Sequence, residues 1–348
     1  MRTDSSSESV LVIADPGTTE MIGERLSEAL AGWESADGWE VSTRSQAYPI
    51  EDHTDFVDVV STLDPDSVSE DIVIYLTDLP RRSGMIPLVA EIDLSRRLAV
   101  ISIPGMGAAF IERRTTNLAR TVVAEMSSEP SEPGPKGERF QRVQDGDVVR
   151  YVAPSKLSRF RLLAGMVHAN RPWRVVAGMS KVMMAAFATG AVSLAYGTMW
   201  ELSDNMGPWR LGVATVLSIA AMIAWLIIEH ELWERPTTPG ERERAVLYNM
   251  STIVTLTIGV MVFYVAVFVL LLLTAWWTIP PDMFADQIGH PAGFSSLAIM
   301  AWLVASVATL GGALGSGMED DDAVRAATYG ARQRQRFERG DSDSRRSG

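Results

Sequence analysis

Four apolar stretches in the second half of the chain constrain its fold more than any other feature. They run roughly over residues 175–199, 211–228, 251–279 and 294–316. An α-helix needs about 20 residues to cross the ~30 Å hydrocarbon core of a bilayer, and each stretch comes close to that length or exceeds it. The first half contains no comparable stretch. The sequence therefore predicts a soluble N-terminal domain followed by an all-α four-helix transmembrane bundle at 173–318.

The negative charge of the chain is concentrated in the predicted soluble domain. Residues 1–126 carry 22 Asp and Glu against 10 Lys and Arg, a difference of −12 that equals the net charge of the whole chain. Phosphate groups repel such a domain, so we expect no nucleic acid among its partners. The chain has no cysteine, which excludes disulfides and thiolate chemistry.

The distribution of arginine predicts how the chain crosses the membrane. Arginines precede the first stretch, recur in the loop 229–249 and are frequent in the tail 319–348, whereas the loop 280–291 has neither Lys nor Arg. Cytoplasmic loops carry the excess of positive residues. We therefore expect a multi-pass protein of the cell inner membrane with both termini in the cytoplasm.

Strand and helix signals alternate in the first domain, 1–126. Apolar strands separated by amphipathic helices are typical of a parallel sheet covered on both faces, a doubly wound α/β or Rossmann-like domain. The sequence predicts a small sheet of four such strands and a short helix near 87–92. The predicted strands lie at 10–14, 40–44, 72–76 and 98–103.

Ligands of such sheets bind beyond the carboxyl ends of the strands. A helix N-terminus following a strand attracts anions through its free N–H groups, and two neighbouring arginines would add positive charge. We predict an anionic, phosphate-bearing small molecule there, but no cofactor is assigned, because neither a Walker loop nor a complete G-x-G-x-x-G is present. No catalytic residue is assigned either. The candidate ligand-binding residues are Asp15, Gly17, Thr18, Thr19, Asp78, Arg81, Arg82, Gly105 and Gly107.

Residues 127–172 are expected to connect the two domains. The segment 127–139 is rich in Pro, Gly and Ser, as in a linker. Farther on, Leu157, Phe160, Leu163 and Val167 recur at helical spacing, which predicts an amphipathic helix at the inner membrane interface. This helix would couple the soluble domain to the bundle.

His230 and Glu234 stand four residues apart, so that a helix would bring both to one face, as in a zinc-binding helix. A catalytic zinc site requires a third protein ligand. The alternative is a charged helix end at the level of the headgroups, and we prefer that interpretation. The sequence therefore predicts no metal site.

Small residues four apart let membrane helices approach each other closely. Such pairs pack helices within one bundle or form an interface between copies of the chain, and the sequence leaves both readings open. The glycines that carry these pairs are Gly190, Gly197, Gly311 and Gly315.

The segments 225–235, 247–249, 288–290 and 311–322 together resemble an uncharacterised family of actinobacterial integral membrane proteins. The likeness covers the membrane half well and the soluble half loosely. It implies a soluble α/β domain followed by four transmembrane helices, and it implies no activity.

Three functions remain open from the sequence. The first is a non-enzymatic membrane protein whose cytoplasmic domain senses a ligand or a protein partner and is coupled to the bundle. The second is an oligomeric channel or small-solute permease gated by that domain. The third is a membrane-tethered enzyme acting at the strand ends. Its partners would be the lipid bilayer, further copies of the chain, and a cytoplasmic protein or anionic ligand.

Overall fold

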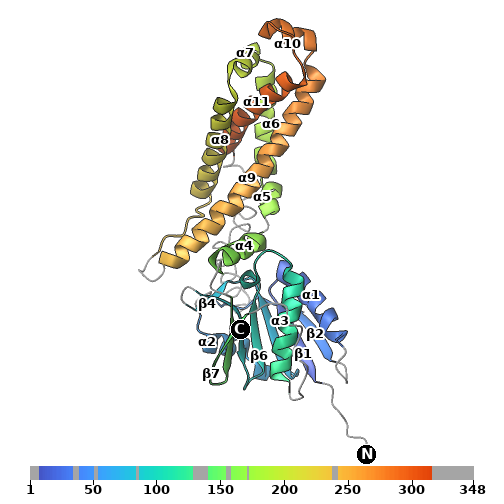
Figure 1. Cartoon of the computed structure of the whole chain (residues 1–348), viewed down its shortest axis with the longest axis vertical. Coiled ribbons are helices and arrows are strands. Elements are labelled where there is room, and N and C mark those ends of the chain that lie inside the picture. Colours follow the sequence, from blue (N-terminus) through green and yellow to red (C-terminus); the bar gives the residue numbers. More distant parts are fainter. Residues whose placement is uncertain are drawn as a thin grey trace, which may run out of the picture. The chain divides into compact units, whose positions relative to one another are not determined.

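The computed structural model of the chain describes residues 8–33, 39–50, 54–83, 86–127, 140–153, 158–170, 172–236 and 242–315. The chain divides into two compact units, and the boundary falls between Ala169 and Asn170. The first unit is an α/β domain and the second is helical, as Figure 1 shows. This confirms the predicted combination of an N-terminal α/β domain with an apolar helical region.

The described residues of the first unit are built on one mixed sheet of eight strands. Seven of them follow the order β2-β1-β3-β6-β5-β8-β7, and β4 pairs with β5. The strands are β1 (Ser9–Ala14), β2 (Glu40–Ser45), β3 (Ile72–Thr77), β4 (Arg81–Ser83), β5 (Ile86–Asp93), β6 (Leu98–Ser102), β7 (Gln141–Asp145) and β8 (Val148–Val152).

The four predicted strands are present and mutually parallel, in the order β2-β1-β3-β6. The prediction that the sheet as a whole is parallel is wrong, because β5, β8, β7 and β4 extend it with antiparallel pairs. The short helix expected near residues 87–92 is instead β5. The nonlocal pairing of β5 with β6 and β8 outweighs the local signal, and the segment carries β-branched residues that suit a buried strand.

The hairpin of β7 and β8 lies within 127–172, the segment expected to connect the domains. Residues 141–152 were expected to belong to the connecting segment, but they form the far edge of the sheet. Gly146 has φ 62° in the turn between the two strands, and Asp-Gly is a strong hairpin signal. Most of the predicted linker, residues 128–139, lies outside the described residues.

Helices α1 (Thr18–Ala31) and α3 (Ile111–Met126) pack against the sheet and against each other. Leu26, Leu30 and Val122 contribute to the same core as Val12 and Ile74 of the central strands. The described α-helices of this unit also include α2 (Phe56–Leu63) and α4 (Ser158–Asn170), whose last residue belongs to the second unit. Because α1, α2 and α3 follow parallel strands, their N-termini lie at the carboxyl edge of the sheet.

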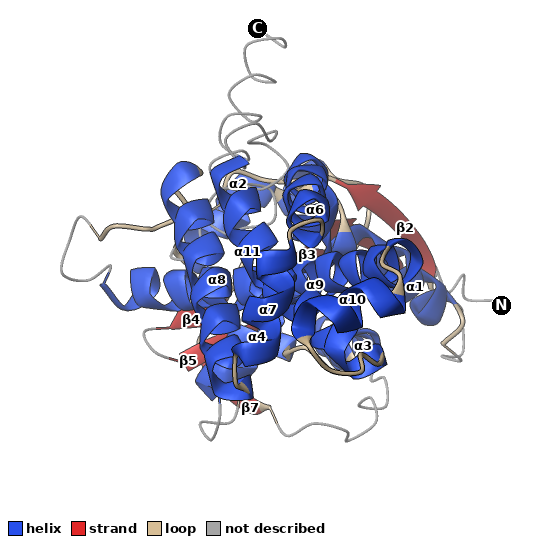
Figure 2. Ribbon diagram, turned by 90° about the horizontal axis from the view of Figure 1, so that it is seen from above, coloured by secondary structure: helices blue, strands red, loops and turns tan. Residues whose placement is uncertain are grey.

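In the part of the second unit that the structure describes, three helices are long and apolar enough to cross a membrane, or four if one bent pair is counted as a single span. The three are α8 (Pro208–Glu229), α9 (Arg242–Thr278) and α11 (Phe294–Gly315), and the bent pair is α6 (Ser180–Leu194) with α7 (Gly197–Asn205). The helix α11 packs against α6, α8 and α9, and these helices are grouped together in Figure 2. This arrangement is consistent with contact to a lipid bilayer.

The first predicted span, 175–199, is not one straight helix. The structure has α5 (Pro172–Gly178), then α6, then α7, and α6 and α7 meet at 89°. At this break the indole Nε1 of Trp200 donates a 2.8 Å hydrogen bond to the carbonyl of Leu194. The bond satisfies a carbonyl at the end of α6, which would otherwise lack a partner.

A polar cluster connects three helices inside the second unit. The hydroxyl of Tyr264 lies 2.9 Å from Ser306 Oγ and 3.2 Å from Thr215 Oγ1, which also accepts a 2.7 Å bond from Trp302 Nε1. These contacts join α8, α9 and α11. Hydrogen bonds between helices in an apolar environment satisfy groups that lipid cannot.

Helices α7 and α10 (Pro281–Ile288) replace two expected loops. The rings of Trp200 and Phe284 meet edge to face at 5.3 Å, and His290 Nε2 lies 3.0 Å from both carboxylate oxygens of Asp204. The two short helices thus form a folded cap, since both follow the ends of longer helices and contact each other.

Candidate functional site at the carboxyl ends of the strands

Asp15 is the first predicted site residue beyond β1, and its side chain is fully buried. Its Oδ1 accepts a 2.5 Å bond from the Tyr75 hydroxyl, and its Oδ2 accepts bonds from Thr77 Oγ1 at 2.7 Å and from the Asp78 amide at 2.9 Å. Tyr48 meets the Tyr75 ring edge to face, and burial raises the pKa of its hydroxyl. Asp15 therefore joins the ends of β1 and β3.

The turn after β3 is held by hydroxyl groups of the neighbouring strands. Thr77 Oγ1 accepts a 3.1 Å bond from the Leu79 amide. Ser102 Oγ, on β6, donates to the Leu79 carbonyl at 2.7 Å and accepts from the Arg81 amide at 3.2 Å. The backbone from Asp78 to Arg81 is thus fixed by side chains from β1, β3 and β6.

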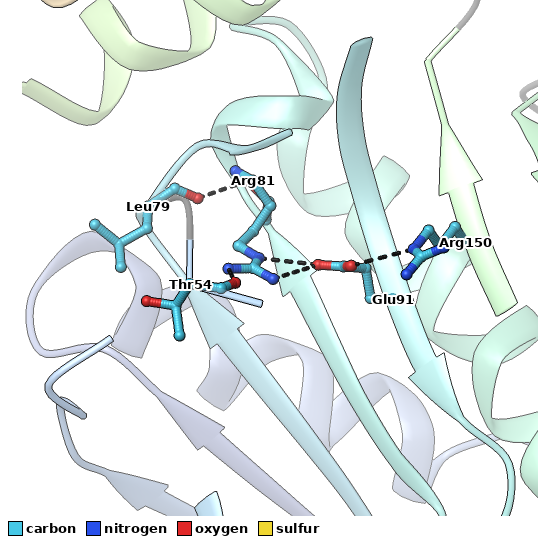
Figure 3. A network of polar contacts seen from close by, with 6 residues as sticks. Thr54, Leu79, Arg81, Glu91 and Arg150 are labelled. Carbon is cyan, nitrogen blue, oxygen red and sulfur yellow. Dashed lines mark hydrogen bonds and ion pairs between the residues drawn. The ribbon is translucent and has the colours of Figure 1, made fainter. Parts of the chain in front are cut away.

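Arg81, one of the two predicted anion-binding arginines, binds a carboxylate of its own chain. Its Nε and Nη2 donate to Glu91 Oε2 at 2.9 and 2.7 Å, and its Nη1 donates to the Thr54 carbonyl at 2.7 Å. Arg150, opposite Glu91 in the sheet, lies 3.5 Å from Oε1 of the same carboxylate. Figure 3 shows Glu91 between the two arginines, with Thr54 beside Arg81.

This ion pair is almost completely buried, with side-chain exposures of 5% for Arg81 and 4% for Glu91. Taking two charges out of water is costly unless they bind each other and further polar groups, and Thr54 and Arg150 supply such groups. The pair therefore fastens β4 and β5 to the segment before α2. Arg82, the other predicted arginine, is half-buried.

The N-terminus of α1, predicted to attract an anion, lies next to a carboxylate of the chain. Gly17 precedes the helix with φ 109°, and its amide donates a 3.3 Å bond to Glu20 Oε2. Thr19 is buried and Thr18 is half-buried. A carboxylate at this position interacts favourably with the helix dipole, in the way that a bound anion would.

The turn after β6 is in close contact with two other segments. A Cβ on Gly105 would lie 2.8 Å from the Leu88 carbonyl oxygen of β5, so this position has room for glycine alone. Gly107 has φ 84°, and its Cβ would lie 2.9 Å from Cγ of Arg161 in α4. The predicted candidates Gly105 and Gly107 are thus placed where the sheet, this turn and α4 meet.

Helix α4 is fastened to the same turn by its backbone and by a side chain. Gly165 lies directly against Pro104, because a Cβ on Gly165 would be 2.9 Å from the carbonyl carbon of Pro104. Arg161 Nε donates a 3.1 Å bond to the Met106 carbonyl, and Arg114 Nη1 donates to the same oxygen at 2.8 Å. The helix that continues into the second unit is therefore docked at the carboxyl edge of the sheet.

Most polar side chains described at this site bind other segments of the chain and so connect the loops to one another. Glu91, Arg150, Arg161 and Gly165 are central to it, and the sequence analysis assigned a site role to none of them. An acidic and a basic residue in otherwise apolar strands, as in β5 and β8, was the signal that could have identified Glu91 and Arg150.

His230 and Glu234, the weak metal candidates, lie where α8 ends. His230 is buried at the C-terminal end of α8, and the backbone of Glu234 exchanges hydrogen bonds of 2.9 and 3.0 Å with the Asn249 side chain. Among the described residues, no group of three or more His, Asp or Glu is placed to hold a metal ion.

Three of the four predicted packing glycines contact neighbouring helices within the chain. Gly190 lies against Leu271 and Ala308, and Gly311 lies against Thr189. Gly197 lies against Gln287. These contacts belong to the packing of the helical unit, and Gly315 is the end of α11.

Comparisons with models of protein families, with curated proteins and with solved structures found no match to this chain.

Proposed function

We propose that this chain is a non-enzymatic regulatory membrane protein, in which a cytoplasmic α/β domain senses a ligand or a protein partner. Its state would pass through α4 to the membrane-spanning helices. The observation that carries the proposal is the docking of α4 on the turn Pro104–Gly107, through Gly165 and Arg161. A change at the carboxyl edge of the sheet would alter this contact first.

The far end of α4 provides the second half of the connection. Asn170, its last residue, belongs to the second unit, where its amide donates to Ser251 Oγ at 3.2 Å and to Thr255 Oγ1 at 3.0 Å. Within the first unit Arg161 bonds α4 to the strand-end turn, and within the second unit Asn170, the last residue of α4, is bonded to α9. A displacement of α4 would be felt at both places.

The cytoplasmic position of the α/β domain is part of the proposal and rests on the arginine distribution. The loop that contains α10 has neither Lys nor Arg, whereas arginines precede α6 and follow α8. Both termini would accordingly lie in the cytoplasm of a bacterium, with the chain in the inner membrane.

Native mass spectrometry of the full chain in lipid nanodiscs tests the sensing part. We expect a monomer or dimer that releases a bound small molecule or protein partner, and we expect release to be lost when Gly107 is replaced by valine. Particles that carry nothing, from several expression conditions, would contradict sensing by this domain.

The second candidate is an oligomeric channel or permease gated by the α/β domain. It is favoured by the polar side chains between the membrane helices, Thr215, Tyr264 and Ser306, which would have to separate to line a pathway. A ring of several copies in the same mass spectra, with no bound molecule, would support the channel over the sensor. An enzyme at the strand ends has less support, since Asp15 and Arg81 bind groups of the chain itself.

A further inference from the structure

Two exposed phenylalanines flank the contact between Gly107 and Arg161 in sequence, at the carboxyl edge of the α/β domain. The side chain of Phe110 is 77% exposed and that of Phe160 is 69% exposed. Phe110 is three residues after Gly107, Phe160 adjoins Arg161 in α4, and Gly107 and Arg161 are in contact. The loop before α3 and the first turn of α4, which carry these rings, therefore lie side by side.

The backbone at Phe110 is unusual for a bulky residue. Phe110 has φ 53° and ψ 36° where it precedes α3, which is the left-handed region. Residues other than Gly, Asn and Asp seldom adopt it, and strain of this kind tends to persist where function requires it. The two preceding alanines, Ala108 and Ala109, are exposed as well. Packing within the domain therefore gives no reason for an aromatic residue here.

Helix α4 has a buried apolar face and an exposed one. Leu162, Gly165 and Met166 are buried, whereas Phe160 and Ala164 are exposed one turn apart. Soluble helices normally present polar residues on the face that looks away from the core. An exposed apolar stripe that continues the surface of Phe110 indicates a site for an apolar partner.

Chain connectivity and charge indicate which partner this is. Asn170, the last residue of α4, and Ser180, where the first candidate membrane-crossing pair begins, are ten residues apart in the sequence. This short connection puts a bilayer around the second unit within reach of α4. Arg113, next to the loop in α3, is exposed, and its positive charge suits lipid phosphates although the domain as a whole is acidic.

We propose that the loop Gly107–Phe110 and the exposed face of α4 bind the surface of the lipid bilayer. Phe110 and Phe160 insert at the boundary between headgroups and acyl chains, and Arg113 contacts phosphate groups. Interfacial segments of this kind bury apolar side chains about 5–10 Å into that boundary. The inference goes beyond ligand sensing and does not depend on it, since it assigns a second membrane contact to the α/β domain itself.

The absence of cysteine from the sequence makes the test direct. Phe110→Cys and Phe160→Cys are each labelled with bimane in the full chain, reconstituted in nanodiscs of phosphatidylglycerol and phosphatidylethanolamine. Some of the lipid carries a nitroxide close to the headgroup. The matched control is Val143→Cys in β7, an apolar position that is 48% exposed and lies away from this edge.

We expect the nitroxide lipid to quench the labels at 110 and 160 about twofold or more strongly than the label at 143, because an interfacial side chain lies at the depth of the quencher. Quenching equal to that of the control, together with full access to aqueous iodide, would overturn the proposal. Labels reached by neither quencher would overturn it too, since the surface would then be covered by protein.

A second set of variants keeps the test informative if labelling at Phe110 disturbs the loop. Ala109→Cys leaves both phenylalanines in place, and we expect the same lipid quenching there. Adding Phe110→Ser and Phe160→Ser to Ala109→Cys should reduce that quenching to the level of the control at 143. Unchanged quenching in the triple variant would show that the rings do not hold the surface at the bilayer.

Discussion

Gly165 in α4 lies against the Pro104 carbonyl so closely that any Cβ at this position would overlap it. Pro104 opens the turn that follows β6, one of the four parallel strands, and α4 leads into the helical unit. The helix can therefore dock at the carboxyl edge of the sheet because residue 165 is glycine and has no side chain. Ala164, the preceding residue, is exposed and provides a neighbouring position where added bulk meets solvent.

The buried pair of Arg81 and Glu91 should contribute strongly to the stability of the α/β domain. Replacing Arg81 by methionine leaves the Glu91 carboxylate buried with Arg150 alone, at 3.5 Å. Breaking a buried pair by removing one partner costs about 3–5 kcal/mol. Chemical denaturation, monitored through the hydrogen exchange of β3 and β6, measures the decrease in the free energy of unfolding. The control is Arg96→Met, at an exposed turn. An equal, small effect of both changes would show that the pair is not structural.

Asp15→Asn should destabilise the same domain while preserving its shape. The carboxylate accepts hydrogen bonds from Tyr75, Thr77 and Asp78. An amide group turns a donor towards at least one of these donors, which leaves a buried group unsatisfied at a cost of about 1–3 kcal/mol. The midpoint of thermal unfolding should fall for this variant and stay within error for Asp66→Asn on the surface. If Asp15→Asn keeps full stability but abolishes ligand release, Asp15 is a binding residue.

The central parallel strands of the sheet could be predicted from the sequence, whereas β5 could not. The strands Ile72–Thr77 and Leu98–Ser102 are short, apolar and buried on both faces, so that their local pattern suffices. A short helix was expected where β5 lies, and the pairing of β5 with β6 and β8 makes it a strand. The partners of Glu91 in this strand are Arg81 and Arg150. Such partners are distant in the sequence, and local periodicity carries no information about them.

The candidate site was predictable to a similar extent. The rule that functional loops follow parallel strands found Asp15, Arg81 and Gly107, all of which lie at the expected edge. The rule did not predict which residues contact the candidate site residues. Glu20, which binds the Gly17 amide, and Arg161, which contacts Gly107, do not directly follow a strand. The spacing of apolar residues predicted the helix α4. It gave no indication that the face of α4 around Gly165 packs against Pro104.

The contact between His290 and Asp204 should make the cap of α7 and α10 sensitive to pH. The hydrogen bond to the Asp204 carboxylate raises the pKa of His290 above its ordinary value of 6.5. A raised pKa means that the stabilising contribution is fully present below pH 6.5 and is lost as the pH rises through the folded value. Glu201, Asp282 and Asp286 lie on the same two helices and add to the negative field.

Hydrogen exchange of residues 197–205 and 281–289, corrected for intrinsic rates, measures this effect between pH 6 and pH 8.5, a range that brackets the titration of histidine. We expect the protection of the cap to decrease as the pH rises and His290→Gln to remove the dependence. A dependence that survives in His290→Gln would assign it to another group.

Labelling of single cysteines should establish the orientation of the chain. Met283→Cys, in α10, is 58% exposed, and Val57→Cys, in α2, is 73% exposed. Because the excess of arginine marks the cytoplasmic side, a reagent that cannot cross membranes should modify position 283 in intact cells. Position 57 should react after the cells are opened. The reverse pattern would place the α/β domain outside the cytoplasm.

The most direct test of the account is hydrogen exchange of full-length Gly165→Val in nanodiscs, compared with Ala164→Val and the unchanged chain. Overpacking at a buried contact costs about 1–3 kcal/mol, so valine at 165 should release α4 from Pro104. We predict faster exchange in Pro104–Gly107 and α4, and also around Ser251 and Thr255 in α9, with no such change in Ala164→Val. Faster exchange confined to α4 and the strand-end turn, with α9 unaffected, would contradict a relay from the α/β domain to the membrane helices.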